Sequence, residues 1–384
     1  MSATDFRTRL EALAADDLLR ARVVLDAPCG PEAVVDGQTL VSFASNDYLG
    51  LAGHPEVVDA FRAGAARWGA GAGASHLVSG HQRPHEELEI ALARFVCMPR
   101  ALFFSTGYMS NLAVLPAFAG RGDTVITDRL NHASLVDAAL LSRATVRRFP
   151  HGDVAAVSRA LEAADGRKVV VTDGVFSMDG DIAPLPELLA LCERHDALLV
   201  VDDAHGFGVL GAQGRGVLSY FGLASPRLVY IGTLGKAAGV AGAFVAGDAD
   251  AMEWLMQNAR SYRYTTAAPA ATACALLTSL RLIEQGDDRR ARLTRHRARM
   301  RRALASCAWP LMPSDTAIQP VRVGGNAEVL ALSARLRDRG LWVPAIRPPT
   351  VPAGGARLRV SLSAAHEAAH IDVLCAALNE VAHD

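Results

Sequence analysis

The chain of 384 residues carries 39 basic and 40 acidic side chains, for a formal net charge of −1, and 51% of its residues are apolar. That length supplies enough material for a large buried core, and we expect two lobes. The balanced charge predicts no basic face, so neither nucleic acid nor an anionic membrane is an expected partner. The six cysteines are scattered without a C-x-x-C pair, which is typical of reduced thiols in a cytoplasmic protein.

The N-terminal segment MSATDFRTRLEALAADDLLRARVV predicts a charged amphipathic helix. It lacks the apolar core and the small-residue cleavage site of a signal peptide. The longest apolar stretches, such as 197–201, are far too short to span a bilayer. We therefore expect a cytoplasmic protein that does not enter the membrane.

The middle third of the chain alternates between short β-branched runs and helical stretches such as 185–195. The runs are ALFF from Ala101, TVIT from Thr124, TVRRF from Thr145, VVVTD from Val169, LLVVDD from Leu198, LVYIGT from Leu228 and AFVAG from Ala243. Their continuous apolarity predicts strands buried on both faces, and the spacing suits βαβ units. The pattern indicates an α/β fold with a mostly parallel sheet, whose ligands bind beyond the carboxyl ends of the strands.

The C-terminal part has a different order of predicted helices and strands. A long helical region from about Pro269 precedes a predicted strand (318–323), helix (327–340), strand (341–346), strand (356–363) and final helix. This order predicts a small α+β domain. We expect three parts: an N-terminal helix and arm (1–45), a large domain (46–285) and a small C-terminal domain (286–384).

Residues able to do chemistry follow the predicted strands. After the first run, the turn Ser105–Tyr108 leads into a helix, and backbone N–H groups at such a turn can bind phosphate. Asp202 and His205 follow another strand, and Lys236 follows the next, in T-x-G-K. There are too few clustered histidines, cysteines or carboxylates to predict a metal site.

A strand-end carboxylate and a histidine, followed about thirty residues later by a lysine, are typical of enzymes that bind pyridoxal 5′-phosphate (PLP). In such sites the acid keeps the pyridine nitrogen protonated, and the lysine forms a Schiff base with the cofactor. Lys236 alone would be an ordinary surface lysine. Asp202 and His205 make it a predicted cofactor site.

The sequence resembles the α-oxoamine synthases, a branch of the fold-type I PLP-dependent transferases. The motifs that carry the resemblance are SFASNDYLGLAGHP from Ser42, DRLNHASLVDA from Asp128, DGVFSMDGDIAPL from Asp173, VDDAHGFGVLGAQGRG from Val201, GTLGKAAGVAGAF from Gly232 and AIRPPTVPAGGARLRVSLSAAH from Ala345. They cover nearly the whole chain. The resemblance implies a large domain with a mostly parallel sheet, a small C-terminal α+β domain and a homodimer.

The resemblance also implies a role for individual residues. As catalytic residues it implies Lys236, which forms the Schiff base and removes the Cα proton, Asp202 at the pyridine nitrogen, His205 at the ring oxygen and His132 stacked on the ring. As further cofactor contacts it implies Gly107, Tyr108, Ser177 and Thr233, with Thr265 and Thr266 reaching the phosphate of the neighbouring subunit. As substrate contacts it implies Arg359 for the amino acid carboxylate, and Arg20, Asn46, His132 and Thr350.

The I-R-P-P-T-V-P sequence favours the biotin-pathway branch, which condenses L-alanine with a pimeloyl thioester of CoA or of acyl carrier protein. Other branches (glycine C-acetyltransferase, 5-aminolevulinate synthase or serine palmitoyltransferase) remain alternatives, as does a non-catalytic PLP-binding regulator. Two departures from the family pattern, His76-Leu77 and Ala237-Ala238, concern the acyl-chain channel rather than the cofactor. The acyl donor therefore stays open between CoA and carrier protein.

Overall fold

The computed structural model describes residues 3–381, which form two compact units. The larger unit comprises residues 51–177 and 181–290, and the smaller one comprises the described residues up to 50, residues 178–180 and those from 291 onward. Each unit is therefore discontinuous in the chain. The predicted boundaries at residues 45 and 285 stay predictions.

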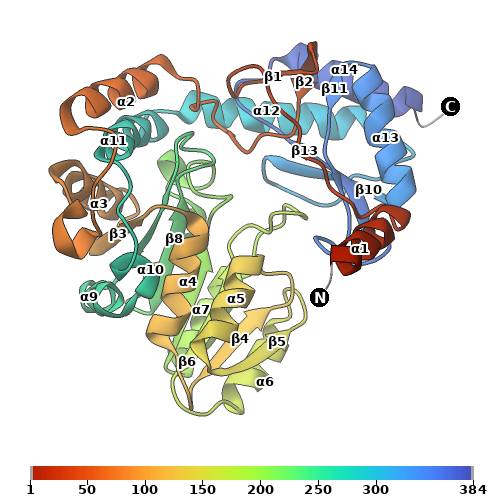
Figure 1. Cartoon of the computed structure of the whole chain (residues 1–384). Helices are drawn as coiled ribbons and strands as arrows, with labels where there is room; N and C mark the ends of the chain where they lie inside the picture. Colours follow the sequence, from red (N-terminus) through yellow and green to blue (C-terminus); the bar gives the residue numbers. More distant parts are fainter. Residues whose placement is uncertain (1–2, 382–384) are drawn as a thin grey trace. The chain divides into compact units, whose positions relative to one another are not determined.

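The larger unit is built on a seven-stranded sheet in the order β3-β9-β8-β7-β6-β4-β5 (Figure 1). Strands β8, β7, β6, β4 and β5 run parallel, whereas β9 is antiparallel to both of its neighbours. The bounds are β3 (Arg100–Phe104), β4 (Thr124–Asp128), β5 (Thr145–Phe149), β6 (Lys168–Asp173), β7 (Ala197–Asp202), β8 (Leu228–Thr233) and β9 (Ala243–Gly247). Every predicted run forms one of these strands, and the prediction of a mostly parallel α/β sheet is confirmed.

Strand β5 departs from the predicted burial on both faces. It is an edge strand, and only Phe149 is buried in it. Arg147 and Arg148 turn outward and donate to the carbonyl oxygens of Ala163 and Arg129. Charged side chains on an edge strand discourage pairing with another chain.

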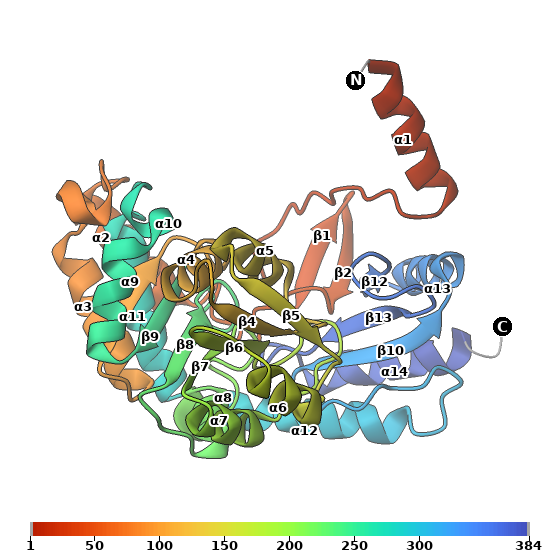
Figure 2. The same cartoon turned by 90° about the horizontal axis from the view of Figure 1, so that it is seen from below.

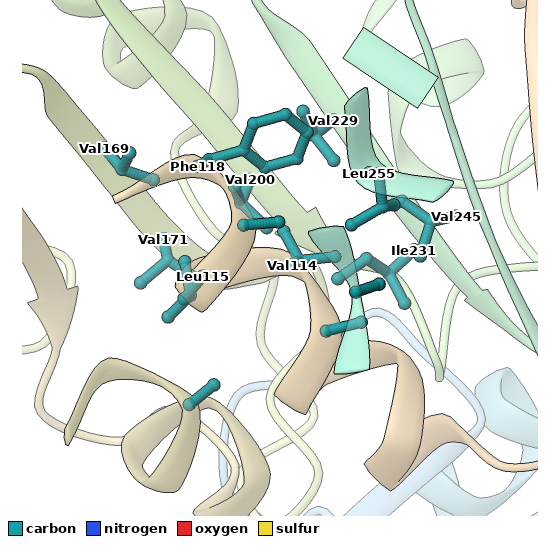
Figure 3. Close-up of a cluster of buried hydrophobic side chains, with 14 of the residues drawn as sticks. Val114, Leu115, Phe118, Val169, Val171, Val200, Val229, Ile231, Val245 and Leu255 are labelled. Atoms are coloured by element: carbon teal, nitrogen blue, oxygen red, sulfur yellow. The ribbon is translucent and has the colours of Figure 1, made fainter. Parts of the chain in front are cut away.

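Helices surround this sheet. Their bounds are α2 (Pro55–Trp68), a π-helix (His76–Gly80), α3 (Arg83–Phe95), α4 (Gly107–Phe118), α5 (Ala133–Ser142), α6 (Val154–Glu162), α7 (Leu185–Arg194), a 3-10 turn (Ala212–Gly214), α8 (Val217–Phe221), α9 (Ala249–Asn258), α10 (Arg260–Arg263) and α11 (Ala270–Glu284). Helix α4 lies beside α5 and against the sheet (Figure 1). Its Val114, Leu115 and Phe118 pack in one buried cluster with valines of β6 to β9 (Figure 3). This core fixes the start of α4 beside the carboxyl ends of the parallel strands.

The smaller unit contains two three-stranded sheets, β1-β2-β11 and β10-β13-β12 (Figure 2). Their bounds are β1 (Glu32–Val35), β2 (Gln38–Ser42), β10 (Ile318–Gly324), β11 (Leu341–Trp342), β12 (Ala345–Ile346) and β13 (Ala356–Ser361). Helix α13 (Asn326–Asp338) contacts β10, β13 and α14 (Ala368–Val381). The expected strand 341–346 is thus two strands in different sheets, because Pro344 lacks the N–H that would continue a ladder.

Two predicted helices are shorter than expected. Helix α1 spans only Ala3–Ala15, because the amides of Leu18 and Leu19 turn back to the Leu13 carbonyl and Asp17 adopts a φ of 56°. The region after Pro269 is divided at Gln285 and Gly286 into α11 and α12 (Asp287–Ala303). Within residues 3–381, no helix combines the length and apolarity needed to cross a membrane.

Candidate active site

A cavity in the larger unit lies at the ends of β6, β7 and β8. Its lining includes eight residues that the sequence singled out: Gly107, Tyr108, His132, Ser177, Asp202, His205, Thr233 and Lys236. It also includes Asn111, Ser134 and Asp173, which the sequence analysis missed. The cavity therefore gathers side chains from several strand ends and from the starts of α4 and α5.

One end of the cavity combines a helix N-terminus with a hydroxyl. Thr106 caps α4 by accepting the amide of Met109 at 3.2 Å, so the helix begins at Gly107. A Cβ atom placed on Gly107 would lie 3.0 Å from Oγ1 of Thr233, so a side chain here would crowd that hydroxyl. The first amides of a helix have no intrahelical acceptor and bind anions well. This end fits a phosphate group.

Lys236 lies in the turn that follows β8, and its Nζ is 2.9 Å from Nε2 of His205. The turn is closed by hydrogen bonds from the Leu234 amide to Gly242 and from the Gly239 amide to the Lys236 carbonyl. Gly239 has a φ of 68°, and a Cβ there would meet the Ala52 backbone nitrogen at 2.4 Å. A larger residue cannot occupy this position, and the turn that presents Lys236 depends on it.

Asp202 ends β7 and is almost fully buried. Its Oδ1 accepts the Ala204 amide at 3.1 Å, and its Oδ2 accepts Nδ2 of Asn111 at 2.6 Å. Asn111 also donates to Oγ of Ser134 at 2.8 Å, and that oxygen lies 2.6 Å from Nδ1 of His132. His132 is also the N-cap of α5. It thus caps a helix and lines the cavity.

Asp173 ends β6 directly beside Asp202 in the strand register. Its carboxylate accepts the backbone N–H of His132 at 3.2 Å. Burial, together with the neighbouring Asp202 charge, raises the pKa of Asp173 well above its ordinary value. Burial lowers the pKa of His132, and the Lys236 charge acts in the same direction while Asp202 opposes it. Asp173 therefore takes up a proton readily, whereas His132 favours its neutral form.

Four of the predicted substrate contacts lie in the smaller unit. Arg359 on β13 is buried and donates to Asn46 at 3.0 Å, to Ser361 at 2.7 Å and to Tyr48 at 3.3 Å. Arg20 donates to the hydroxyl of Thr350 at 3.2 Å. The structure thus joins the four predicted residues in two pairs, Arg359 with Asn46 and Arg20 with Thr350.

Thr265 and Thr266 do not line the cavity. They lie in the loop between α10 and α11, where Thr265 is half-buried and Thr266 is exposed. The amide of Ala267 donates to the carbonyl of Ala74, which ties this loop to the glycine-rich segment 69–74. Their predicted role at the phosphate of a second subunit stays a prediction.

Three histidines outside the cavity lie close enough together to suggest a metal site: His76, His81 and His85. Both ring nitrogens of His85 are committed, however, because Nδ1 accepts the Gln82 amide and Nε2 bonds the Ala268 carbonyl. His76 and His81 share a hydrogen bond of 2.9 Å between their Nδ1 atoms, and Nε2 of His81 bonds Glu86. His76, His81 and Glu86 are thus joined by hydrogen bonds and His85 is bonded to backbone groups, so the cluster is not a set of three free ligands.

The family model for aminotransferase class I and II matches residues 38–378. The chain therefore belongs to the aminotransferase class I and II family.

Relatives of this chain are named 8-amino-7-oxononanoate synthase, which confirms the resemblance found in the motifs, and two of them illustrate the similarity. That of Aromatoleum aromaticum is 61% identical over 95% of each chain, and that of Azoarcus sp. is 58% identical over 98% of this chain and 97% of its own. A solved serine palmitoyltransferase of S. paucimobilis with bound PLP and myriocin is 30% identical, with a TM-score of 0.93 over 99% of this chain and 97% of that one.

Proposed function

We propose that this protein is an 8-amino-7-oxononanoate synthase, which condenses L-alanine with a pimeloyl thioester and releases CO₂ and the free thiol, in biotin biosynthesis. The observation that carries the proposal is the meeting of Lys236, His205 and Asp202 in one cavity of a chain 61% identical to a synthase of that name. The observed groups fit PLP. Gly107 at the start of α4 and the Thr233 hydroxyl line the end that suits a phosphate group, and Asp202 offers a carboxylate for a ring nitrogen.

When bound, PLP supplies an electron sink for negative charge that develops on the amino acid Cα. In our proposal Asp202 holds the proton on the ring nitrogen, and its orientation is fixed by Asn111 and Ala204. Lys236 anchors the cofactor, removes the Cα proton and later returns a proton to the product. The imidazole of His205, 2.9 Å from Nζ, orients the lysine and hydrogen-bonds the ring oxygen.

The substrate contacts follow the same proposal. A guanidinium binds a carboxylate with two parallel hydrogen bonds, and Arg359 is held in place by Asn46 and Ser361. Arg359 and Asn46 would bind the carboxylate of alanine, and Arg20 and Thr350 would contact the substrate too. His132 and Ser177 would contact the ring and its oxygen. The pimeloyl group would be delivered as a thioester of either CoA or acyl carrier protein.

We further propose a cytoplasmic homodimer, in which Thr265 and Thr266 reach the phosphate bound by the neighbouring subunit. The half-buried and exposed positions of these two residues, on a loop outside their own cavity, suit such a contact. The scattered cysteines suit a reducing compartment.

A thiol-release assay tests the function. Alanine, glycine and serine are each combined with pimeloyl-, acetyl-, succinyl- and palmitoyl-CoA and with pimeloyl-acyl carrier protein. We expect alanine with a pimeloyl thioester to give the highest kcat/KM. One methyl group discriminates by only about 1–3 kcal/mol, so all rates must be compared. Faster release with glycine and acetyl- or succinyl-CoA, or with serine and palmitoyl-CoA, would assign a sister enzyme. PLP binding without any thiol release would indicate a regulator.

A further inference from the structure

Two side chains missed by the sequence analysis connect the acid of the cavity to its histidine. Nδ2 of Asn111 donates to Oδ2 of Asp202 at 2.6 Å and to Oγ of Ser134 at 2.8 Å. Oγ of Ser134 lies 2.6 Å from Nδ1 of His132. All four side chains line the same cavity, and Asn111 and Ser134 are buried.

The direction of each hydrogen bond follows from Asp202. Its carboxylate oxygens can only accept, so Asn111 must turn its amide nitrogen rather than its oxygen toward them. The second hydrogen of that nitrogen points to Ser134, whose oxygen accepts it. The hydroxyl hydrogen of Ser134 can then donate to Nδ1 of His132, and a second donor to that nitrogen favours this direction over the reverse one.

A second donor points to the same nitrogen. The backbone N–H of Ser134 donates to Nδ1 of His132 at 3.3 Å. A ring nitrogen that accepts from two donors carries no hydrogen of its own, so the hydrogen of a neutral imidazole must be on Nε2.

We propose that Asn111 and Ser134 are positioning residues that hold His132 as its Nε2–H tautomer. They also fix the orientation of its ring relative to Asp202. The tautomer of His132 does not depend on the proposed function, but the role of that tautomer in catalysis rests on it. A fixed tautomer presents a single donor, at Nε2, and keeps the ring plane constant for stacking on the cofactor.

Several charged groups also surround the His132 ring. Asp137 on α5, Asp202 on β7 and Lys236 after β8 all act on His132, and Asp173 on β6 accepts its backbone N–H. The two hydrogen bonds at Nδ1 come from Ser134 rather than from these groups. Helix capping alone requires only the backbone bond, so the hydroxyl can be tested separately.

The test is nuclear magnetic resonance of the PLP-loaded enzyme labelled with ¹⁵N-histidine. His132 is assigned by the resonances lost in His132→Gln. We expect Nδ1 of His132 to be unprotonated and Nε2 to carry the hydrogen. A wild-type spectrum with the hydrogen on Nδ1 would overturn the proposal without any variant. Because the readout is the ring itself, it stands even if the proposed reaction is wrong.

The variant Ser134→Ala removes the hydroxyl but keeps the backbone donor. We expect its Nδ1 resonance to move toward that of a protonated nitrogen and kcat to fall about 2- to 10-fold, the range for one neutral hydrogen bond. The matched control is Ser142→Ala on the same helix, whose buried hydroxyl bonds the Ala139 carbonyl at 2.6 Å outside the cavity. It should leave the His132 spectrum unchanged.

Asn111→Leu provides a second, independent variant. Without the amide, the Ser134 hydroxyl is free to turn, and we expect the His132 spectrum to shift in the same direction as in Ser134→Ala. Because the residues act as one chain, the double variant should shift little further than either single one. A His132 spectrum identical to wild type in both folded single variants would contradict the proposed positioning role of Asn111 and Ser134.

Discussion

Arg359 and Asn46 are 313 residues apart in the chain, and Nη1 of Arg359 donates to Oδ1 of Asn46 at 3.0 Å. Both residues were singled out from different motifs, and the smaller unit brings them together. Oγ of Ser361 and the hydroxyl of Tyr48 also accept from this guanidinium. These hydrogen bonds hold the buried guanidinium in one orientation, which suits bidentate binding of a carboxylate.

The first prediction follows from this arrangement. Arg359→Lys keeps the charge but loses the planar fork, so KM for the amino acid should rise about 10- to 100-fold with a smaller change in kcat. Steady-state kinetics with alanine as the varied substrate measure it. The matched control is Arg322→Lys on β10, an exposed strand arginine, which should change neither constant. An unchanged KM in Arg359→Lys would remove this residue from the substrate site.

The second prediction uses the scarcity of lysine. The chain contains only two lysines, Lys168 and Lys236. Lys168 starts β6 at the end of the strand opposite Asp173, and its Nζ donates to the His195 carbonyl at 3.2 Å. Lys236→Ala should lose both turnover and the visible absorbance of lysine-bound cofactor. Lys168→Arg should keep both. Normal turnover in Lys236→Ala would refute the assignment.

The third prediction concerns the proposed dimer. A Lys236→Ala subunit lacks its lysine but has an intact loop, whereas a Thr265→Ala, Thr266→Ala subunit has the lysine but an altered loop. Each variant alone should have low activity. If the site is shared, unfolding and refolding them together should restore activity, because each hybrid dimer contains one intact site. Activity no higher than the sum of the separate variants would show that the loop does not act across subunits.

The fourth prediction is a pH dependence of stability. His151 lies between Asp128, at 3.2 Å, and Asp181, at 2.8 Å, and these hydrogen bonds raise its pKa to about 10. A raised pKa stabilises the fold fully below the unfolded value near 6.5, and this stability is lost as the pH rises through about 10.

His151→Asn should therefore be less stable than wild type at pH 6, by about 1–2 kcal/mol once partial exposure is allowed for. The difference should shrink by pH 10.5. Urea unfolding of both proteins at several pH values measures it, with the wild-type curve as the reference for other titrating groups. A difference that stays constant across this range would contradict the assignment. The Asp181 contact also links His151 to the segment after β6 that carries Ser177, because the Phe176 amide donates to the Asp181 carbonyl.

The sheet could be predicted because its inner strands are buried on both faces and so appear as unbroken apolar runs. Strand β5 could have been recognised as an edge from Arg147 and Arg148, which interrupt its run. Pro344 similarly carried the signal that divides 341–346. The end of α1 had no comparable marker, because it depends on the backbone turning at Asp17.

Asp202, His205 and Lys236 could be predicted because strand ends converge at one edge of a parallel sheet. Asp173 had the same signal, since it ends β6 as Asp202 ends β7. Asn111 lies one helical turn after Gly107, which is a weaker signal. The role of Ser134 could not be predicted from sequence, because it depends on α4 and α5 lying side by side.

The near absence of lysine has a consequence beyond catalysis. Positive charge outside the cavity is carried almost entirely by guanidinium groups, which stay protonated up to about pH 12. Amine-directed reagents, such as acylating labels or immobilisation chemistries, would find only two side-chain targets. Coupling at Lys236 would inactivate the enzyme, whereas a support that couples through thiols or carboxyl groups avoids this lysine.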